Sequence, residues 1–321
     1  MRARRAVTMA VAVLALVAGG CINLGPLLVG EMHAVTVRPS PRWFEPNRVA
    51  LVDVNGFIGS EGGLLPPFSG TPLADVREKL ERAADDGSVK AIVLRIDSPG
   101  GEVTASDTVY REIVRFKQET GKPVVASLQG TAASGGYYVA LAADHIVASP
   151  TCVTGSVGVI IRLLNVEDLF DKIGLESQVV KSGEKKDMAS PTRDMTEEER
   201  EILQGVTEQM FARFVDTVRR NRPEMTGQQL DLISDGRIVT AEEALELNMV
   251  DEVGYLEEAI DLSFELAGIK DADVILYRPF PDYNTNIYAR ASQERGVLEQ
   301  GMKALLKREG PAFLYLWAPG L

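Results

Sequence analysis

A serine and a lysine are the residues of this chain whose surroundings best suit them for chemistry. Ser134 lies in TAASGGYYVALAAD, which begins at Thr131, and Lys186 lies in KSGEKKDMASPTRDMT, which begins at Lys181. Small residues, two glycines and an apolar helical pattern predict that the Ser134 hydroxyl lies at a helix N-terminus, facing backbone N–H groups. A deprotonated lysine from a short loop could activate this hydroxyl for attack on a carbonyl carbon without any histidine. The chain has only two histidines, so the usual triad would be hard to assemble.

Each of these residues also has a purely structural interpretation. Ser134 could cap a helix, with the two glycines allowing close helix packing. Lys186 could be a solvated surface lysine, and Lys185 lies beside it, so the residue pattern alone does not choose between the two. As a base, either lysine would need burial or a neighbouring cation to lower its pKa towards neutrality.

Two glycine-containing segments could complete such a site. Residues 97–101 (DSPGG) end an apolar stretch, and backbone N–H groups in such a turn can bind an oxyanion. The alternative there is a tight turn between a strand and a helix. Ser156, in the sequence GSVG, could orient the lysine amine by accepting a hydrogen bond, or it could cap a turn. The sequence shows no cluster of metal-ligand residues, and we expect no cofactor.

The elements that must position these residues alternate along the chain. Apolar segments predict strands at residues 48–58, 90–96, 122–128 and 145–148. Helical spacing predicts helices from Thr71, over 105–119, after Ser134, over 166–173, from a capping box at Thr196 and Glu199, and over 240–248 and 256–267. This order predicts an α/β fold in which helices cover a largely parallel sheet.

The N-terminal residues predict an export signal. Three arginines precede an uncharged stretch, and its densest apolar part is too short for a full membrane span. Ala18-Gly19-Gly20-Cys21 resembles a lipoprotein cleavage box, so we favour lipidation at Cys21 over an uncleaved anchor. With either anchor, the basic end stays in the cytosol and the catalytic part is extracytoplasmic.

The remaining composition gives the domain organisation and limits the partners. We expect a signal or anchor segment over 1–30, a tether over 31–47, one folded domain over 48–282 and a C-terminal extension over 283–321. The formal net charge of −12 argues against a nucleic-acid partner. A disulfide framework is not expected, and Cys152 is predicted to be a small buried hydrophobe. Residues 59–70 are rich in glycine and proline, which predicts a loop.

The segments DSPGG, TAASGGYYVA, GSVGVI and KSGEKKDMASPTRDMT resemble, in this order, those of the bacterial signal peptide peptidase A family of Ser/Lys membrane proteases. The resemblance runs from about Arg48 to Ala267. It implies a ClpP/crotonase-like spiral α/β fold. It also implies roles for the site residues: Ser134 as nucleophile, Lys186 as general base, the N–H groups of Gly101 and Gly135 as the oxyanion hole, and Ser156 as the residue that positions the lysine.

The same resemblance carries expectations about assembly and substrates. The chain has the length of the short, single-copy members, whose serine and lysine resemble parts from neighbouring subunits in a homo-tetramer or homo-octamer. The implied substrates are extended apolar peptides, such as cleaved signal-peptide remnants at the membrane. The apolar tail from Ala312 resembles the C-termini of the family, and it is either a last strand or a segment that lies in a neighbour's groove and is trimmed.

Three rival interpretations remain. A crotonase-type acyl-CoA enzyme would share the fold, but acyl-CoA is cytosolic and the export signal argues against it. A catalytically inactive, membrane-tethered scaffold is disfavoured by the intact Ser134 and Lys186. A conventional hydrolase using His145 is disfavoured because His145 follows the Ser134 helix directly and is better explained as the start of a strand.

Overall fold

The computed structural model describes residues 32–42, 46–59, 71, 73–279 and 313–317. The predicted signal segment with Cys21, most of the loop over 59–70 and most of the C-terminal extension lie outside these residues. No helix within the described ranges is long and apolar enough to cross a membrane.

The centre of the fold is a largely parallel sheet. Its strands follow the order β1-β10-β2-β3-β4-β5-β9, in which only β1 runs antiparallel to its neighbour. The bounds are β1 Met32–Arg38, β2 Arg48–Ile58, β3 Val89–Glu102, β4 Val124–Ala133, β5 His145–Ala148, β9 Glu252–Val253 and β10 Asp273–Pro279. The fold class expected from the alternating strand and helix patterns is therefore confirmed.

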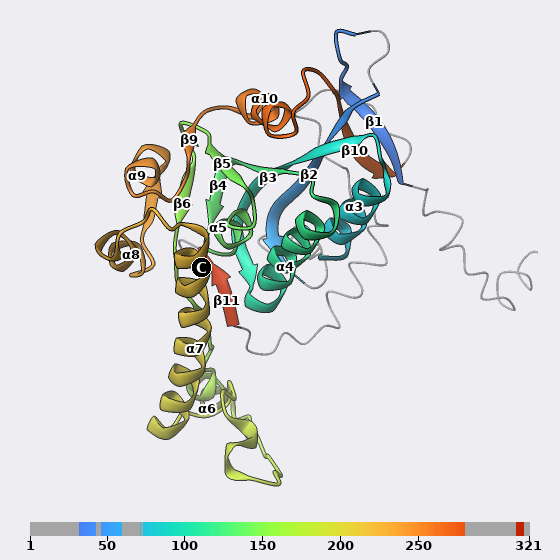
Figure 1. Cartoon of the computed structure of the whole chain (residues 1–321). Helices are drawn as coiled ribbons and strands as arrows, with labels where there is room; N and C mark the ends of the chain where they lie inside the picture. Colours follow the sequence, from blue (N-terminus) through green and yellow to red (C-terminus); the bar gives the residue numbers. More distant parts are fainter. Residues whose placement is uncertain (1–31, 43–45, 60–70, 72, 280–312, 318–321) are drawn as a thin grey trace, which may run out of the picture.

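Helices cover both faces of this sheet, as Figure 1 shows for α3 (Leu73–Asp85) and α4 (Val103–Thr120) on one side and α10 (Leu256–Leu266) on the other. Successive residues of a strand point to opposite faces. In β3, Ile92 and Leu94 belong to the core under α3 and α4, whereas Ala91 and Val93 belong to the core under α10. Burial on both faces explains the apolar run over residues 91–94 of β3.

Shorter elements gather where β4 ends. Ser134 separates β4 from α5 (Gly135–Ala140), and β6 (Val153–Gly155) pairs with both β4 and β8 (Ile238–Thr240). The strand β11 (Phe313–Leu316) pairs with the end of β3 and with β7 (Ile160–Ile161). The expectation that the C-terminal tail forms a last strand is confirmed for these residues.

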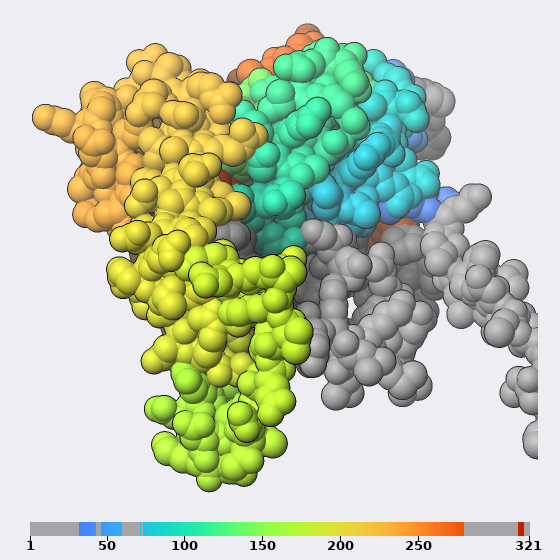
Figure 2. Space-filling view, turned by 90° about the horizontal axis from the view of Figure 1, so that it is seen from below, coloured from blue at the N-terminus to red at the C-terminus, as the bar shows by residue number. Residues whose placement is uncertain are grey.

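A long projection leaves this body, and we call residues 162–200 the arm. It contains α6 (Glu167–Ile173), the 3₁₀ turn η1 (Glu184–Asp187) and the start of α7 (Glu197–Asn221). Both views show the arm extending away from the sheet and its helices (Figures 1 and 2). The remaining helices, α8 (Gly227–Ile233) and α9 (Ala241–Glu246), pack beside β8 and β9 at the base of α7.

The structure adds elements that the sequence patterns did not predict. The segment expected to be a tether contains β1, which pairs with the equally unexpected β10. Residues 97–101 are not a turn after β3 but its continuation, which pairs with β2 through Gly101. The glycines of this segment therefore lie on the sheet beside β4.

Candidate active site

Ser134 lies at a strained turn between β4 and α5. Its φ of 53° is rare for a residue with a Cβ, and its side chain is buried. The Ser134 N–H donates to the Gly155 carbonyl oxygen at 2.7 Å, which fastens the turn to β6. The side chain makes no capping hydrogen bond, so the interpretation of Ser134 as a helix cap is not supported. A serine on a strained strand–turn–helix is a typical position for a nucleophile.

The two glycines predicted as oxyanion donors lie beside each other. A Cβ on Gly135 would lie 3.1 Å from the Gly101 nitrogen and 2.5 Å from the Ser106 Oγ. A Cβ on Gly101 would collide with the Ile58 carbonyl oxygen. Only glycines therefore allow these two backbones to approach so closely, and the approach places their N–H groups next to the Ser134 turn.

Ser98 organises the glycine segment, and the sequence analysis did not single it out. Its fully buried hydroxyl donates to the Gly56 carbonyl oxygen at 2.6 Å and accepts from the Gly100 N–H at 3.0 Å. Gly100 has a φ of 102°, which favours glycine. These bonds fix the path of β3 through Gly101. The sequence signal that could have identified Ser98 is its place within the DSPGG segment.

Ser156 directly follows β6, the strand that pairs with the end of β4. The pairing of Ala133 with Gly155 brings the two serines to corresponding positions at the ends of β4 and β6. Ser156 also has a positive φ, 52°, and its N–H donates to the Arg237 carbonyl oxygen at 2.6 Å. Ser156 lines a pocket of about 410 Å³, together with residues of α7, the turn at Asp235 and Leu316 of β11.

Lys186 does not lie near Ser134 within one chain. Its turn lies beside the start of α7, where the Lys185 Nζ is 2.6 Å from the Glu198 Oε2. Further along α7, the Phe214 ring packs on the Tyr138 ring of the Ser134 helix, at 4.9 Å between centroids. A helix rises 1.5 Å per residue, so these two contacts of α7 lie about 24 Å apart along its axis. The structure thus brings together Ser134, Gly101, Gly135 and Ser156, and it places Lys186 on the arm.

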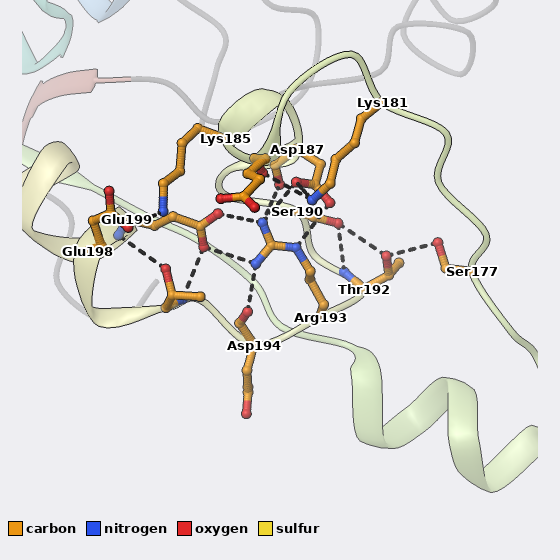
Figure 3. A network of polar contacts seen from close by, with 12 residues as sticks. Ser177, Lys181, Lys185, Asp187, Ser190, Thr192, Arg193, Asp194, Glu198 and Glu199 are labelled. Carbon is orange, nitrogen blue, oxygen red and sulfur yellow. Dashed lines mark hydrogen bonds and ion pairs between the residues drawn. The ribbon is translucent and has the colours of Figure 1, made fainter.

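A network of ion pairs holds the lysine turn, as shown in Figure 3. The Arg193 guanidinium donates to both carboxylate oxygens of Asp187, at 2.9 and 3.0 Å, and to both of Glu199, at 2.6 and 2.9 Å. Lys181 adds a contact of 2.7 Å to Asp187. These cations lower the pKa of the Asp187 carboxyl, and hydrogen bonds from Arg193 lower the pKa of Glu199 to about 2. The sequence analysis did not identify Arg193, although it lies within the quoted lysine segment.

The C-terminal strand β11 lies along the oxyanion segment. Tyr315 pairs with Gly101, and the Trp317 N–H donates to the Pro99 carbonyl oxygen at 2.8 Å. Alternation of hydrogen-bonded pairs in an antiparallel ladder makes the Tyr315–Gly101 pair a bonded one as well. A Cβ on Gly100 would collide with the Tyr315 carbonyl oxygen and would lie 2.7 Å from the Gly135 nitrogen. The Tyr315 carbonyl therefore lies close to both glycine amides.

The Tyr315 side chain fills an aromatic pocket below this strand. Its ring lies 5.1 Å from that of Tyr138 and 4.7 Å from that of Phe214, and its hydroxyl donates to the Met210 carbonyl oxygen at 2.9 Å. The side chain is fully buried, and burial raises the pKa of its hydroxyl. A short apolar segment is thus bound in extended form with one aromatic side chain inserted.

Two other sequence expectations are settled by position. His145 starts β5 and pairs with Val125, at the opposite end of β4 from Ser134. A strand rises about 3.3 Å per residue, so the stretch of β4 between the two positions keeps His145 on the order of 20 Å from Ser134, and His145 cannot act on it. Cys152 is buried, and this burial raises the pKa of its thiol to about 12, as expected of a small core residue.

Comparisons with known proteins agree with this geometry. The profile described as Peptidase family S49 matches residues 116–270, and the profile described as Clp protease matches residues 72–153. The chain is 36% identical to a putative protease of Synechocystis sp., over 69% of this chain and 75% of that protein. It is also 36% identical to a putative signal peptide peptidase SppA of Enterococcus faecium, over 70% of this chain and 64% of that protein.

Longer relatives and a solved structure are also similar. Protease 4 of Salmonella typhi is 33% identical over 80% of this chain, and the match spans 41% of that relative. The structure of ClpP1 from Listeria monocytogenes aligns with a TM-score of 0.42 and 19% identity, over 65% of this chain and 94% of that one.

Proposed function

Because the chain belongs to peptidase family S49 and is a serine protease of the signal peptide peptidase A type, we propose that it cleaves apolar peptides with a Ser134–Lys186 dyad. The observation that carries this proposal is the Ser134 turn, with its buried hydroxyl beside the glycine amides of β3 and α5. A peptide carbonyl placed there would have the N–H groups of Gly101 and Gly135 as donors for the oxyanion.

In the proposed mechanism, neutral Lys186 takes the proton of the Ser134 hydroxyl, and the oxygen attacks the peptide carbonyl carbon. The tetrahedral oxyanion accepts hydrogen bonds from Gly101 and Gly135. Lys186 then protonates the leaving amine, and a water molecule deprotonated by Lys186 hydrolyses the acyl-enzyme. Ser156 accepts a hydrogen bond from the amine and orients it.

The dyad requires two copies of the chain, because Lys186 lies on the arm and far from its own Ser134. We propose that the arm of one copy reaches the pocket of the next, where Ser156 lies. Glu208 lines that pocket and would attract the Lys186 ammonium group as the arm docks. The assembly that follows is a ring such as a tetramer or an octamer.

The proposed substrate class rests on the bound tail. β11 shows how an extended apolar segment pairs with β3 and inserts a large side chain between Tyr138 and Phe214. Remnants of cleaved signal peptides have this apolar character. The similarity to the putative signal peptide peptidase SppA of Enterococcus faecium supports the same substrate.

Mixing two inactive variants tests the shared dyad. Ser134→Ala and Lys186→Ala are purified separately, mixed, dissociated and reassembled, and hydrolysis of a fluorogenic apolar peptide is measured. If neighbouring copies share each site, about a quarter of the sites in an equal mixture recover both groups. No activity in a mixture that light scattering shows to be reassembled would reject the shared dyad. Peptide cleavage by Ser134→Ala alone would reject Ser134 as the nucleophile.

We further propose that residues 1–30 hold the enzyme at the outer side of the cell membrane, with a lipid on Cys21. The export signal and the cleavage box support this location. Labelling cells with a radioactive fatty acid tests it: the wild-type chain should become labelled and Cys21→Ala should not. Equal labelling of both chains would reject lipidation at Cys21.

A further inference from the structure

The arm contains more charge than an exposed loop needs for folding. Arg193 binds two carboxylates at once, and Glu199 is only 2% exposed although it belongs to the first turn of a surface helix. Glu199 also accepts from the Thr196 N–H at 3.0 Å, which completes the capping box of α7. The two-sided contact of Arg193 therefore joins the lysine turn directly to the N-terminus of α7.

We propose that Arg193 is the positioning residue for Lys186: it locks the turn to α7 and withholds the neighbouring carboxylates from the lysine amine. This inference rests on the proposed role of Lys186 as the base. Arg193 acts through Asp187 and Glu199 and is not placed in contact with substrate.

Arg193 fixes the geometry of the lysine turn. Asp187 directly follows Lys186, and Arg193 holds its two carboxylate oxygens as well as its backbone carbonyl oxygen, the last at 3.3 Å. A planar guanidinium that binds a carboxylate through two parallel bonds fixes direction as well as distance. Because the same guanidinium binds Glu199 in this way, the Lys186 backbone cannot rotate relative to α7 without breaking several bonds.

The electrostatic part concerns which cations are paired. The charged groups around the turn are Lys181, Glu184, Lys185, Asp187, Arg193, Asp194, Glu198 and Glu199. Asp187 pairs with Lys181 and Arg193, Glu199 with Arg193, and Glu198 with Lys185. Within the part of the chain that the structure describes, Lys186 is exposed and has no ion pair. This distinction favours Lys186 over Lys185 as the base, a choice that the sequence left open.

Removing Arg193 should change Lys186 in a definite direction. The carboxylates of Asp187 and Glu199 would lose their strongest partner, and negative charge beside an amine raises the pKa of that amine. A base with a higher pKa is protonated over more of the pH range, so catalysis would begin only at higher pH.

The test compares Arg193→Gln with the double variant Arg193→Gln/Asp187→Asn in the assembled full chain. Arg200→Gln is the matched control, because Arg200 also lies near the start of α7 but pairs only with the exposed Glu197, at 3.7 Å. Two quantities are measured: kcat/KM for an apolar peptide against pH, and the pH dependence of Lys186 acetylation by mass spectrometry. Acetylation reports the lysine pKa whether or not the protein is active.

We expect Arg193→Gln to move both titrations upward and to lower kcat about tenfold to a hundredfold. The double variant should recover most of the pH shift but not the kcat, since the turn stays unlocked. Arg200→Gln should match the wild type. If Arg193→Gln fails to assemble, Arg193→Lys replaces it, and it should keep the wild-type titration but lower kcat.

Unchanged acetylation and an unchanged kcat in an assembled Arg193 variant would overturn the proposal. Failure of the proposed function looks different: cleavage would then survive in Ser134→Ala, while the acetylation of Lys186 would still report whether Arg193 controls its pKa.

Discussion

Ser134 and Ser156 both adopt positive φ values, 53° and 52°, at the ends of paired strands. Such backbone conformations cost free energy and persist where the surrounding structure enforces them. Here the enforcing contacts are the N–H bonds of Ser134 to Gly155 and of Ser156 to Arg237. The strain keeps the Ser134 side chain out of a capping hydrogen bond, so its hydroxyl stays available for chemistry.

The lysine pair gives the first prediction at this scale. Lys186→Ala should lower kcat/KM by about a thousandfold or more, because the nucleophile loses its base. Lys185→Ala is the matched control and should stay within about threefold of the wild type, since its surface ion pair with Glu198 contributes little. Steady-state hydrolysis of a fluorogenic peptide decides between them. The opposite ranking would move the base to Lys185.

Gly135→Ala gives the second prediction. The new Cβ would lie 2.5 Å from the Ser106 Oγ, and the resulting shift would displace one oxyanion donor. Losing one such donor lowers kcat by about a hundredfold to a thousandfold. The double variant Gly135→Ala/Ser106→Gly removes the conflicting hydroxyl and should recover part of the kcat. Equal kcat in the single and double variants would show that Ser106 is not the obstacle.

At the scale of elements, the helix α7 carries the catalytic geometry. Its capping box fastens the lysine turn at one end, and its Met210 and Phe214 contact Tyr315 further along. The tail strand β11 occupies the edge of β3 on which a peptide substrate would pair. Under the proposed function, β11 and substrate would compete for the same backbone groups.

Deleting residues 313–321 should lower KM for an added apolar peptide several-fold, because the competing strand is removed. Intact mass gives a second readout: if Ser134 trims the tail, the full mass should persist only in Ser134→Ala. Phe57→Leu, a core change in the neighbouring β2, serves as the control for general disturbance of the sheet. An unchanged KM in a correctly assembled deletion variant would show that β11 does not compete with the substrate.

The Arg193 network gives an acid-sensitive element. The pKa of Glu199 is lowered to about 2 in the folded chain, below its unfolded value of about 4.3. Its stabilising contribution is therefore complete above the unfolded pKa and is lost as the pH falls from about 4.5 towards 2. After correction for the intrinsic exchange rate at each pH, the protection of the amides of residues 181–200 should fall in this range while β3 and β4 stay protected. Arg193→Gln should show fast exchange of the arm already at pH 6; slow exchange in that variant would contradict the assignment.

Much of the order of helices and strands could be predicted from sequence, because the signals for these elements lie within their own segments. The alternating run 48–58 and the capping box at Thr196 carry their own signals, and both appear where expected. Strand β10 has the apolar pattern VILY, but its role depends on a parallel partner far away in sequence, β2. Short strands such as β6 and β9 lack the length that a periodic pattern needs.

The candidate site was predictable only in part, for the same reason. Ser134, Gly101, Gly135 and Ser156 belong to segments whose glycine and serine patterns are visible in the chain, and the structure brings them together. The position of the lysine turn depends on the arm and on the contacts of Arg193 with Asp187 and Glu199. No periodic pattern in the sequence predicts these contacts. Sequence patterns also left Lys185 and Lys186 equivalent, and only their ion pairs distinguish them.

At the scale of the whole molecule, the arm exposes apolar surface. Of the fourteen large apolar side chains exposed among the described residues, eight lie between residues 160 and 180, and Leu164 and Val180 are among the most exposed. Apolar side chains exposed in such number within one segment favour a contact with another protein. Figure 2 shows the arm projecting from the body. Its length allows it to reach a neighbouring copy.

Leu164→Ser combined with Val180→Ser should weaken assembly and lower peptidase activity together, because each site would lose its incoming lysine. The control is Leu232→Ser, which alters an exposed apolar side chain on α8, away from the arm. Light scattering and peptide hydrolysis at several protein concentrations measure both effects. Full activity from a monomeric variant would show that one chain is sufficient.

If the proposed dyad is shared between copies, the distance between the lysine turn and Ser134 also sets the stoichiometry of the enzyme. A head-to-tail row of any length would leave one terminal serine without a lysine and one terminal lysine without a serine. Closing the row into a ring is the arrangement that gives every serine a base without leaving a defective end. Turnover per chain would then measure the fraction of chains that are in closed rings. Isolated chains would have no protease activity until they assembled.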